Sequence, residues 1–107
     1  MTDVPSWCVT TNADNATATA TRAAPAGGIR HYITSISGSF TVAQTTAKTL
    51  ILKDGTTEIA RWYVFNSQPV IFASPIRLSA ATAANLELAA SGTGGQVGAA
   101  TMSGFTK

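Results

Sequence analysis

The sequence predicts an all-β fold, an antiparallel β-sandwich or jelly roll of about eight strands. Short apolar segments recur about every 10 to 15 residues, with glycine, proline and aspartate turn signals between them. No segment shows the sustained i, i+3, i+4, i+7 apolar spacing of an amphipathic helix. Because 107 residues are enough for one domain, we expect an N-terminal arm over residues 1–15 and a single sandwich over residues 16–107.

The first expected strand covers residues 16–23, and threonine and alanine alternate strictly over residues 16–21. The β-branched threonine side chain fits a pleated surface better than a helix. Pro25 and the glycine pair that follows it end this strand and turn the chain. We interpret residues 14–23 as an arm or edge strand whose small side chains permit close approach to the sandwich or to a neighbouring subunit.

A long strand and a hairpin follow. The segment 29–42, "IRHYITSISGSFTV", contains Gly38, which predicts a bulge or bend at that position. The segments 48–54 and 58–65 are two strands, and the Asp54-Gly55 pair between them predicts a hairpin with a loop of three or more residues.

The last third of the chain contains four further expected strands. "PVIF" (69–72) and "IRLSA" (76–80) are short, and a proline begins or precedes each of them, which suits a strand start or a sheet edge. Leucine alternates with polar residues over 85–90, and a strand rich in glycine and alanine over 96–105 closes the domain.

The hairpin is apolar on both faces, because Ile51 opposes its leucine neighbours and Tyr63 opposes Trp62. A sheet with one solvated face alternates more cleanly, so we expect a loop, a third layer or another chain to cover the outer face. Another chain is the favoured interpretation, and a cap formed by the N-terminal arm is the alternative. Burying such a side chain contributes roughly 1.5–3 kcal/mol, so a few per subunit are enough for stable oligomers.

Charge and cysteine content argue against several classes of partner. The formal net charge is +2 and no basic run occurs, which argues against nucleic acid binding. Cys8 is the single cysteine, so neither an intrachain disulfide nor a thiolate zinc cluster can form, which is typical of folding in a reducing cytoplasm. The sequence contains no signal-peptide pattern and no apolar run of ~20 residues, so we expect no membrane partner.

The residues that could carry catalysis are few. His31 is the only histidine, which excludes a jelly-roll metal site built from several histidines, and we interpret it as a hydrogen-bonded surface or interface residue. Nothing in the sequence supports a Cys8–His31 nucleophile and base pair. The five carboxylates are explained by the turn, the arm and solvent-facing strand positions. We therefore expect no enzyme activity, no catalytic residue, no metal and no cofactor.

Four aromatic residues allow two interpretations. Aromatic faces suit the apolar faces of sugars, so a stacking platform is one possible role for Trp7, Tyr32, Trp62 and Tyr63. Packing in the core or at an interface is the other role, and it is the more common one.

The chain resembles small virion proteins of tailed bacteriophages in the general character and order of four segments: "RAAPAGGIRHYITSISGSFT", "LILKDGTTEIARW", "SPIRLSAATAANLELAASG" and "VGAATMSGFT". These proteins include head decoration or cement proteins, short jelly-roll chains that assemble as trimers on capsid shells. The resemblance covers residues 22–106 and carries over no functional residue by position. It implies a homotrimer that binds the major capsid protein on the virion surface after synthesis in the host cytoplasm.

The leading hypothesis is therefore a non-enzymatic capsid decoration protein. The residues that we expect at its interfaces are Trp7, Arg22, Arg30, His31 and Trp62. The alternative is a carbohydrate- or receptor-binding module of a phage tail or fibre, and a third hypothesis is an enzyme that joins His31 to a carboxylate.

Overall fold

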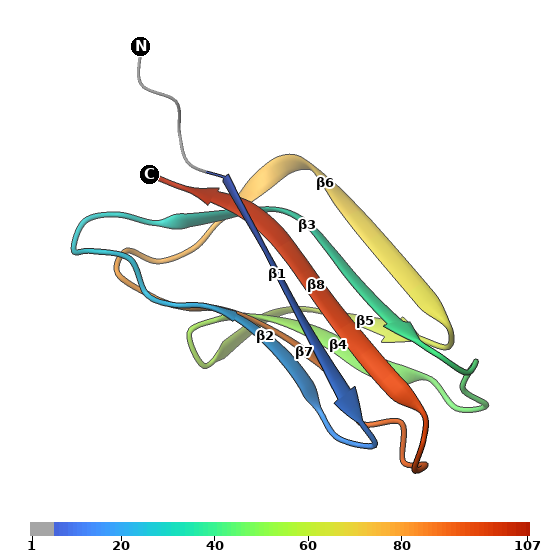
Figure 1. Ribbon diagram of the computed structural model, residues 1–107. Helices are drawn as coiled ribbons and strands as arrows, with labels where there is room; N and C mark the ends of the chain where they lie inside the picture. The colour runs from blue at the N-terminus through green and yellow to red at the C-terminus, as the bar shows by residue number, and fades with distance from the viewer. Residues whose placement is uncertain (1–5) are drawn as a thin grey trace.

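The computed structural model describes residues 6–107 as eight strands in two four-stranded sheets (Figure 1). One sheet has the order β1-β8-β3-β6 and the other the order β2-β7-β4-β5. The strand bounds are β1 Ser6–Asp14, β2 Ala18–Arg22, β3 His31–Phe40, β4 Lys48–Asp54, β5 Thr57–Val64, β6 Ser67–Arg77, β7 Ala84–Leu88 and β8 Val97–Thr106.

The strand order confirms the predicted jelly roll. Every pair of neighbouring strands is antiparallel, and consecutive strands lie in opposite sheets except for the β4–β5 hairpin. Such alternation is what two Greek keys folded onto each other produce. The described residues form strands, turns and bends but no helix.

The N-terminal segment is part of the sandwich from residue 6 onwards. All nine residues of β1 pair with β8, from Ser6 opposite Phe105 to Asp14 opposite Val97. Residues 6–14 of the expected arm are therefore an edge strand, while its residues 1–5 lie outside the described part of the chain. Strand β2 is the edge of the other sheet and lies within the expected strand 16–23, but it begins only at Ala18 and ends at Arg22, because a bend occupies residues 15–16.

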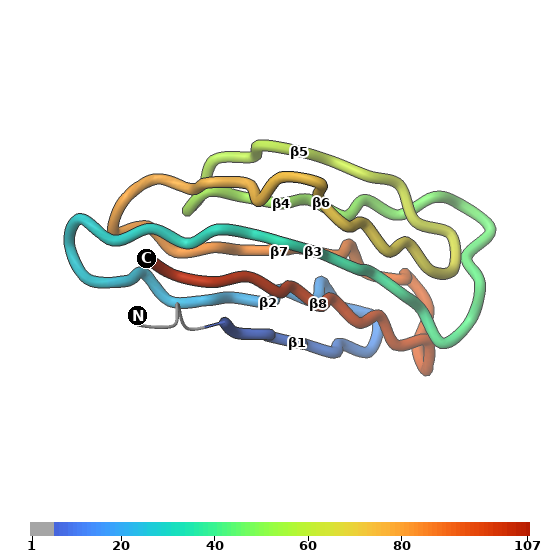
Figure 2. Tube along the Cα trace, turned by 90° about the horizontal axis from the view of Figure 1, so that it is seen from above, coloured from blue at the N-terminus to red at the C-terminus, as the bar shows by residue number. Residues whose placement is uncertain are grey.

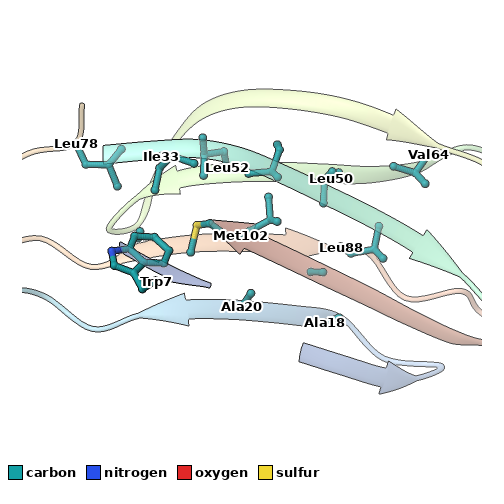
Figure 3. Close-up of a cluster of buried hydrophobic side chains, with 14 of the residues drawn as sticks. Trp7, Ala18, Ala20, Ile33, Leu50, Leu52, Val64, Leu78, Leu88 and Met102 are labelled. Carbon is teal, nitrogen blue, oxygen red and sulfur yellow. The ribbon is translucent and has the colours of Figure 1, made fainter. Parts of the chain in front are cut away.

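The core lies between the two sheets, where the inward positions of each strand meet (Figure 3). The alternation of Leu86 and Leu88 with polar residues is confirmed, because both leucines are fully buried. Ala18 and Ala20 are also fully buried, so β2 contributes small side chains to the core. The buried apolar side chains are Trp7, Ala18, Ala20, Ile33, Ile36, Phe40, Leu50, Leu52, Val64, Leu78, Ala84, Leu86, Leu88, Ala100 and Met102.

The bulge of the long strand β3 is not at Gly38, where the sequence predicted it. The register of β3 against both neighbours shifts between Ile33 and Ser35, whereas Gly38 pairs regularly. Gly38 is instead a site of close approach, because a Cβ there would lie 3.1 Å from a methyl group of Leu50 in the opposite sheet.

The β4–β5 hairpin has a shorter loop than the sequence predicted. Asp54 pairs with Thr57, so only Gly55 and Thr56 form the loop, and Gly55 has a φ of +65°. A glycine with positive φ at the first central position is typical of a two-residue type II′ turn. The extra residue appears as a bulge at Ile59, since the register shifts there.

The segments 69–72 and 76–80 are not two separate strands, because β6 runs from Ser67 to Arg77. An irregularity interrupts its pairing with β3 between Ile71 and Ile76, at the segment that contains Pro75. Strand β6 is a sheet edge, so the missing N–H groups of Pro69 and Pro75 are tolerated there, as expected.

Gly104 tests the packing of β8 against its neighbours. A Cβ at position 104 would collide with the Tyr32 carbonyl oxygen and would lie 2.9 Å from the Trp7 ring. We therefore expect Gly104→Ala to lower the free energy of unfolding by about 1–3 kcal/mol, measured by urea denaturation. Gly94→Ala is the control, because nothing lies within 4 Å of a Cβ there, and it should change the free energy by less than about 0.5 kcal/mol. Equal stability of the two variants would contradict the described packing.

Candidate functional site

Most of the residues expected at interfaces meet at one end of the sandwich. Trp7 is near the start of β1, Arg22 ends β2, and His31 begins β3 directly after Arg30. Trp62 lies apart from them on β5, where its ring is 6.0 Å from that of Phe72. The structure thus brings four of the five residues to one end, and their role at an interface stays a prediction.

A chain of hydrogen bonds connects three strands of one sheet to the end of β2 in the other. The Trp7 indole N–H donates to Thr106 Oγ1 at 2.9 Å, and Thr106 Oγ1 lies 2.8 Å from His31 Nδ1. His31 Nε2 lies 2.7 Å from the carbonyl oxygen of Ala23, which can only accept, so Nε2 carries the proton. In the neutral imidazole, Nδ1 then accepts from the Thr106 hydroxyl. We call this chain the Trp7–Ala23 relay.

The relay gives His31 a structural role. The side chain is only 2% exposed, and both of its ring nitrogens are used within the protein. The Trp7 ring meets it edge-on, with centroids 5.4 Å apart. Among residues 6–107, no hydrogen bond or ion pair joins His31 to a carboxylate. This geometry gives the enzyme hypothesis no acid–base pair at His31.

Two arginines border the relay from outside. The Arg22 guanidinium lies over the Trp7 ring, 5.4 Å from its centroid, in a cation–π contact. Arg30 donates from Nη1 to the Leu78 carbonyl at 3.1 Å, and its backbone exchanges two hydrogen bonds with Lys107. The two side chains therefore have different roles. Arg30 connects the start of β3 to the segment after β6, whereas Arg22 is exposed with its guanidinium against the Trp7 ring.

A solvent-open hollow of about 670 Å³ adjoins the relay. Volumes between roughly 300 and 1,000 Å³ are usual for ligand pockets. Apolar side chains form much of its wall, and two cations, Arg22 and Lys107, border it. The full lining is Val9, Thr21, Arg22, Ala23, Ala24, Pro25, Ile29, His31, Thr106 and Lys107.

The described carboxylates have local roles elsewhere. Glu58 pairs with Arg61 at 2.7 Å and Glu87 with Lys53 at 2.6 Å. The hydrogen bond from Arg61 holds the pKa of the Glu58 carboxyl below its usual value. Asp54 accepts hydrogen bonds from Ser79, and Asp14 accepts one from the Gly95 amide. No group of three or more His, Cys, Asp or Glu residues within 6–107 is placed to hold a metal ion.

The four aromatic residues considered for a sugar platform do not share a surface. Trp7 is buried, and Tyr32 stacks on Phe105 with centroids 4.9 Å apart. Trp62 is half-buried against Phe72, whereas Tyr63 is exposed. These four side chains therefore do not form one stacking platform.

A second candidate surface lies on the side of the sandwich away from the relay. Strands β5 and β6 are edge strands of the two sheets and lie together there, while β1 and β2 lie together on the opposite side (Figure 2). Four of the six exposed large apolar side chains in residues 6–107 belong to β5, β6 or the turn between them: Ile59, Tyr63, Phe65 and Ile71. We call this surface the β5–β6 edge.

The structure tests how the outer face of the β4–β5 hairpin is covered. Within the described chain, β1 packs at the opposite side, against β8 and β2, so it does not cap the hairpin. Tyr63 and Phe65 are more than half exposed, and Ile71 is 84% exposed. The cap by the N-terminal arm is thus excluded for residues 6–14, and cover by another chain stays a prediction.

Sequence reasoning missed Thr106, the centre of the relay. Thr106 is 75 residues from His31, and only the antiparallel pairing of β3 with β8 brings the two together. No spacing or motif in the sequence connects them. The hydroxyl of a threonine near the end of an apolar strand gives no signal of its own.

Comparisons with known proteins identify no family for this chain. No protein-family model matches the chain, and no curated protein matches it. Among solved structures, the chain is similar to the carbohydrate-binding module CBM36 in complex with calcium and xylotriose. The identity is 14%, the match covers 99% of this chain and 89% of that one, and the TM-score is 0.38. A likeness this weak carries no argument about function.

Residues 6–107 include no helix with the length and apolarity that a membrane crossing requires.

The relay predicts a specific loss of stability. Thr106→Val keeps the shape of the side chain but leaves the Trp7 N–H and His31 Nδ1 without their partner, so we expect the free energy of unfolding to fall by about 1–3 kcal/mol. Thr106→Ser retains the hydroxyl and should stay close to the parent in urea denaturation. Thr10→Val, which removes an exposed hydroxyl pair with Thr101, is a second control. A Thr106→Val cost no larger than that of Thr10→Val would refute the relay.

Proposed function

We propose that the chain is a non-enzymatic structural protein of a tailed-phage virion. It assembles as a homotrimer and binds the major capsid protein on the outside of the head, after synthesis in the host cytoplasm. The resemblance of residues 22–106 to phage decoration proteins motivates the capsid location. The β5–β6 edge is the observation that supports self-association.

The β5–β6 edge has two properties of an interaction surface. It carries several exposed apolar side chains, of which Ile71 is the most exposed, and exposed apolar surface can mark interaction sites. It also consists of two edge strands, whose unpaired backbone groups attract other chains unless they are covered. Three copies whose β5–β6 edges converge on a threefold axis would cover both features at once.

Trimerisation would also strengthen binding to a shell. Three linked copies contact three neighbouring capsid proteins, so modest contacts per copy add up through avidity. The described groups of this chain suit such passive binding, because His31 and the acidic side chains are engaged in structural contacts. The proposed mechanism is cross-linking of shell subunits without chemistry.

Mixing with capsids tests this function. Purified protein is added to undecorated capsids of the phage that encodes it, and electron microscopy is used to look for added density. We expect density at threefold or quasi-threefold positions, and we expect Ile71→Lys to weaken it strongly by opposing trimer formation. Thr93→Lys, in an exposed turn at the opposite end of the strands from the relay, is the control and should decorate normally. Bare capsids at saturating protein would rule out the proposal.

A second candidate function is favoured by one observation on the same edge. Tyr63 and Phe65 lie two positions apart across the buried Val64, and both are exposed. Two neighbouring exposed aromatic rings suit the apolar faces of a sugar chain. The alternative is therefore a carbohydrate- or receptor-binding module of a phage tail or fibre.

Glycan binding distinguishes the two candidates. If the alternative holds, affinity electrophoresis with host-surface glycans shows retardation that Tyr63→Ala abolishes and that Thr10→Ala, on the opposite edge, leaves unchanged. The decoration function gives no retardation of the parent protein. Retardation together with bare capsids would replace the first candidate by the second.

A further inference from the structure

The hollow beside the relay has features of a binding site that neither candidate function uses. Most of its lining residues belong to β1, β2 or the chain that follows β2, and these two strands lie on the side away from β5 and β6 (Figure 2). Its wall combines the apolar side chains of Val9, Pro25 and Ile29 with the cations Arg22 and Lys107. A ligand that fits must therefore offer apolar surface and negative charge close together.

Cationic residues gather at this end of the described sandwich. Four of the seven cationic residues of the chain stand at strand ends here: Arg22, Arg30, Arg77 and Lys107. The ion pairs of residues 6–107 involve Lys53 and Arg61 instead. Within residues 6–107, none of these four cations belongs to an ion pair. Clustered cations attract an anionic ligand, and low-dielectric walls strengthen the attraction.

Arg22 is held ready for an anion. Its guanidinium rests on the Trp7 ring, and Trp7 is fixed by its hydrogen bond to Thr106. Stacking on an aromatic face leaves the N–H groups in the guanidinium plane able to bind a carboxylate in a bidentate manner. Less side-chain entropy is lost on binding when the guanidinium is already oriented.

The strands beside the hollow favour an extended chain as its occupant. Val9 belongs to β1 and Thr21 to β2, and each of these strands is the edge of its sheet. An extended peptide that passes an open edge gains backbone hydrogen bonds as well as side-chain contacts. We propose that the hollow binds an extended peptide segment of a partner protein in which acidic and apolar residues alternate. The acidic residues contact Arg22 and Lys107, and an apolar side chain packs against Ile29 and Pro25.

Peptide binding in the hollow does not depend on the proposed function, because it follows from the chemistry of the ligand and not from the assembly that supplies the ligand. The two surfaces lie on opposite sides, so a trimer joined through the β5–β6 edge leaves the hollow accessible. Failure of peptide binding leaves capsid decoration untouched, and failure of decoration leaves peptide binding untouched.

The chain has two built-in reporters for a binding experiment. Trp7 and Trp62 are its only tryptophans, so in Trp62→Phe the fluorescence comes from Trp7 alone, beneath Arg22. His31 is the only histidine and lines the hollow, so its ring gives a single set of NMR signals in the unmodified protein. The NMR measurement keeps the test valid even if Trp62→Phe disturbs the fold.

The test titrates the protein with an acetylated and amidated peptide of alternating glutamate and leucine. We expect saturable changes in Trp7 fluorescence and in the His31 signals, weaker at high salt because the contacts are charged. The matching glutamine and leucine peptide should bind at least about tenfold more weakly. Arg22→Gln should reduce affinity by a similar factor, whereas the control Arg61→Gln, which removes an arginine paired with Glu58, should not.

Three results would overturn the inference. The first is an absence of any change at millimolar peptide. The second is binding that Arg22→Gln leaves unaltered. The third is inorganic phosphate binding as tightly as the acidic peptide, because it would identify a general anion site without any contribution from the apolar wall.

Discussion

The Trp7–Ala23 relay is the constraint on which the shape of this jelly roll depends. It joins β1, β8 and β3 of one sheet to the residue that follows β2 in the other, through the buried side chains of Trp7 and His31 and the half-buried Thr106. Polar groups at such depth are costly unless each has a partner, so the relay fixes where β2 ends and the crossing to β3 begins. The position of Arg22 over Trp7, and with it the charged rim of the hollow, follows from this connection.

The opposite side of the sandwich has no comparable closure. There the two sheets meet through half-buried aromatic side chains, with Trp62 6.0 Å from Phe72, and apolar side chains remain exposed on both edge strands. One side is therefore held together by hydrogen bonds within the chain, while the other side still has apolar surface to bury. The proposed trimer uses this asymmetry, since it places the exposed apolar side at the centre of the assembly and leaves the hydrogen-bonded side outward.

The sequence was sufficient for the fold class because alternation records which side chains face the core. The threonine and alanine pattern of residues 18–21 and the leucines of β7 both appear in the structure as inward and outward positions. The position of the bulge was not predictable in this way: it lies between Ile33 and Ser35 and depends on how β3 pairs with strands distant in sequence. Gly38 was read as a bulge because its contact with Leu50 in the other sheet is invisible in the sequence.

The sequence predicted which residues belong to the candidate site but not how they are connected. A lone histidine, two arginines and a tryptophan were expected at interfaces, and the structure places all four at one end. Their connection through Thr106 could not be inferred, because it requires the pairing of the first residue of β3 with the last residue of β8. Trp62 was also expected at an interface, but its strand parity points it toward the core and leaves Tyr63 outside.

The mass of the protein in solution tests most directly whether the β5–β6 edge is a self-association surface. Sedimentation equilibrium at micromolar concentration should give three times the chain mass of 11.0 kDa. Phe65→Lys and Ile71→Lys should each shift the mass toward 11.0 kDa, because they place a charge on the surface that the trimer buries. A parent protein that sediments as a monomer at this concentration would contradict the account.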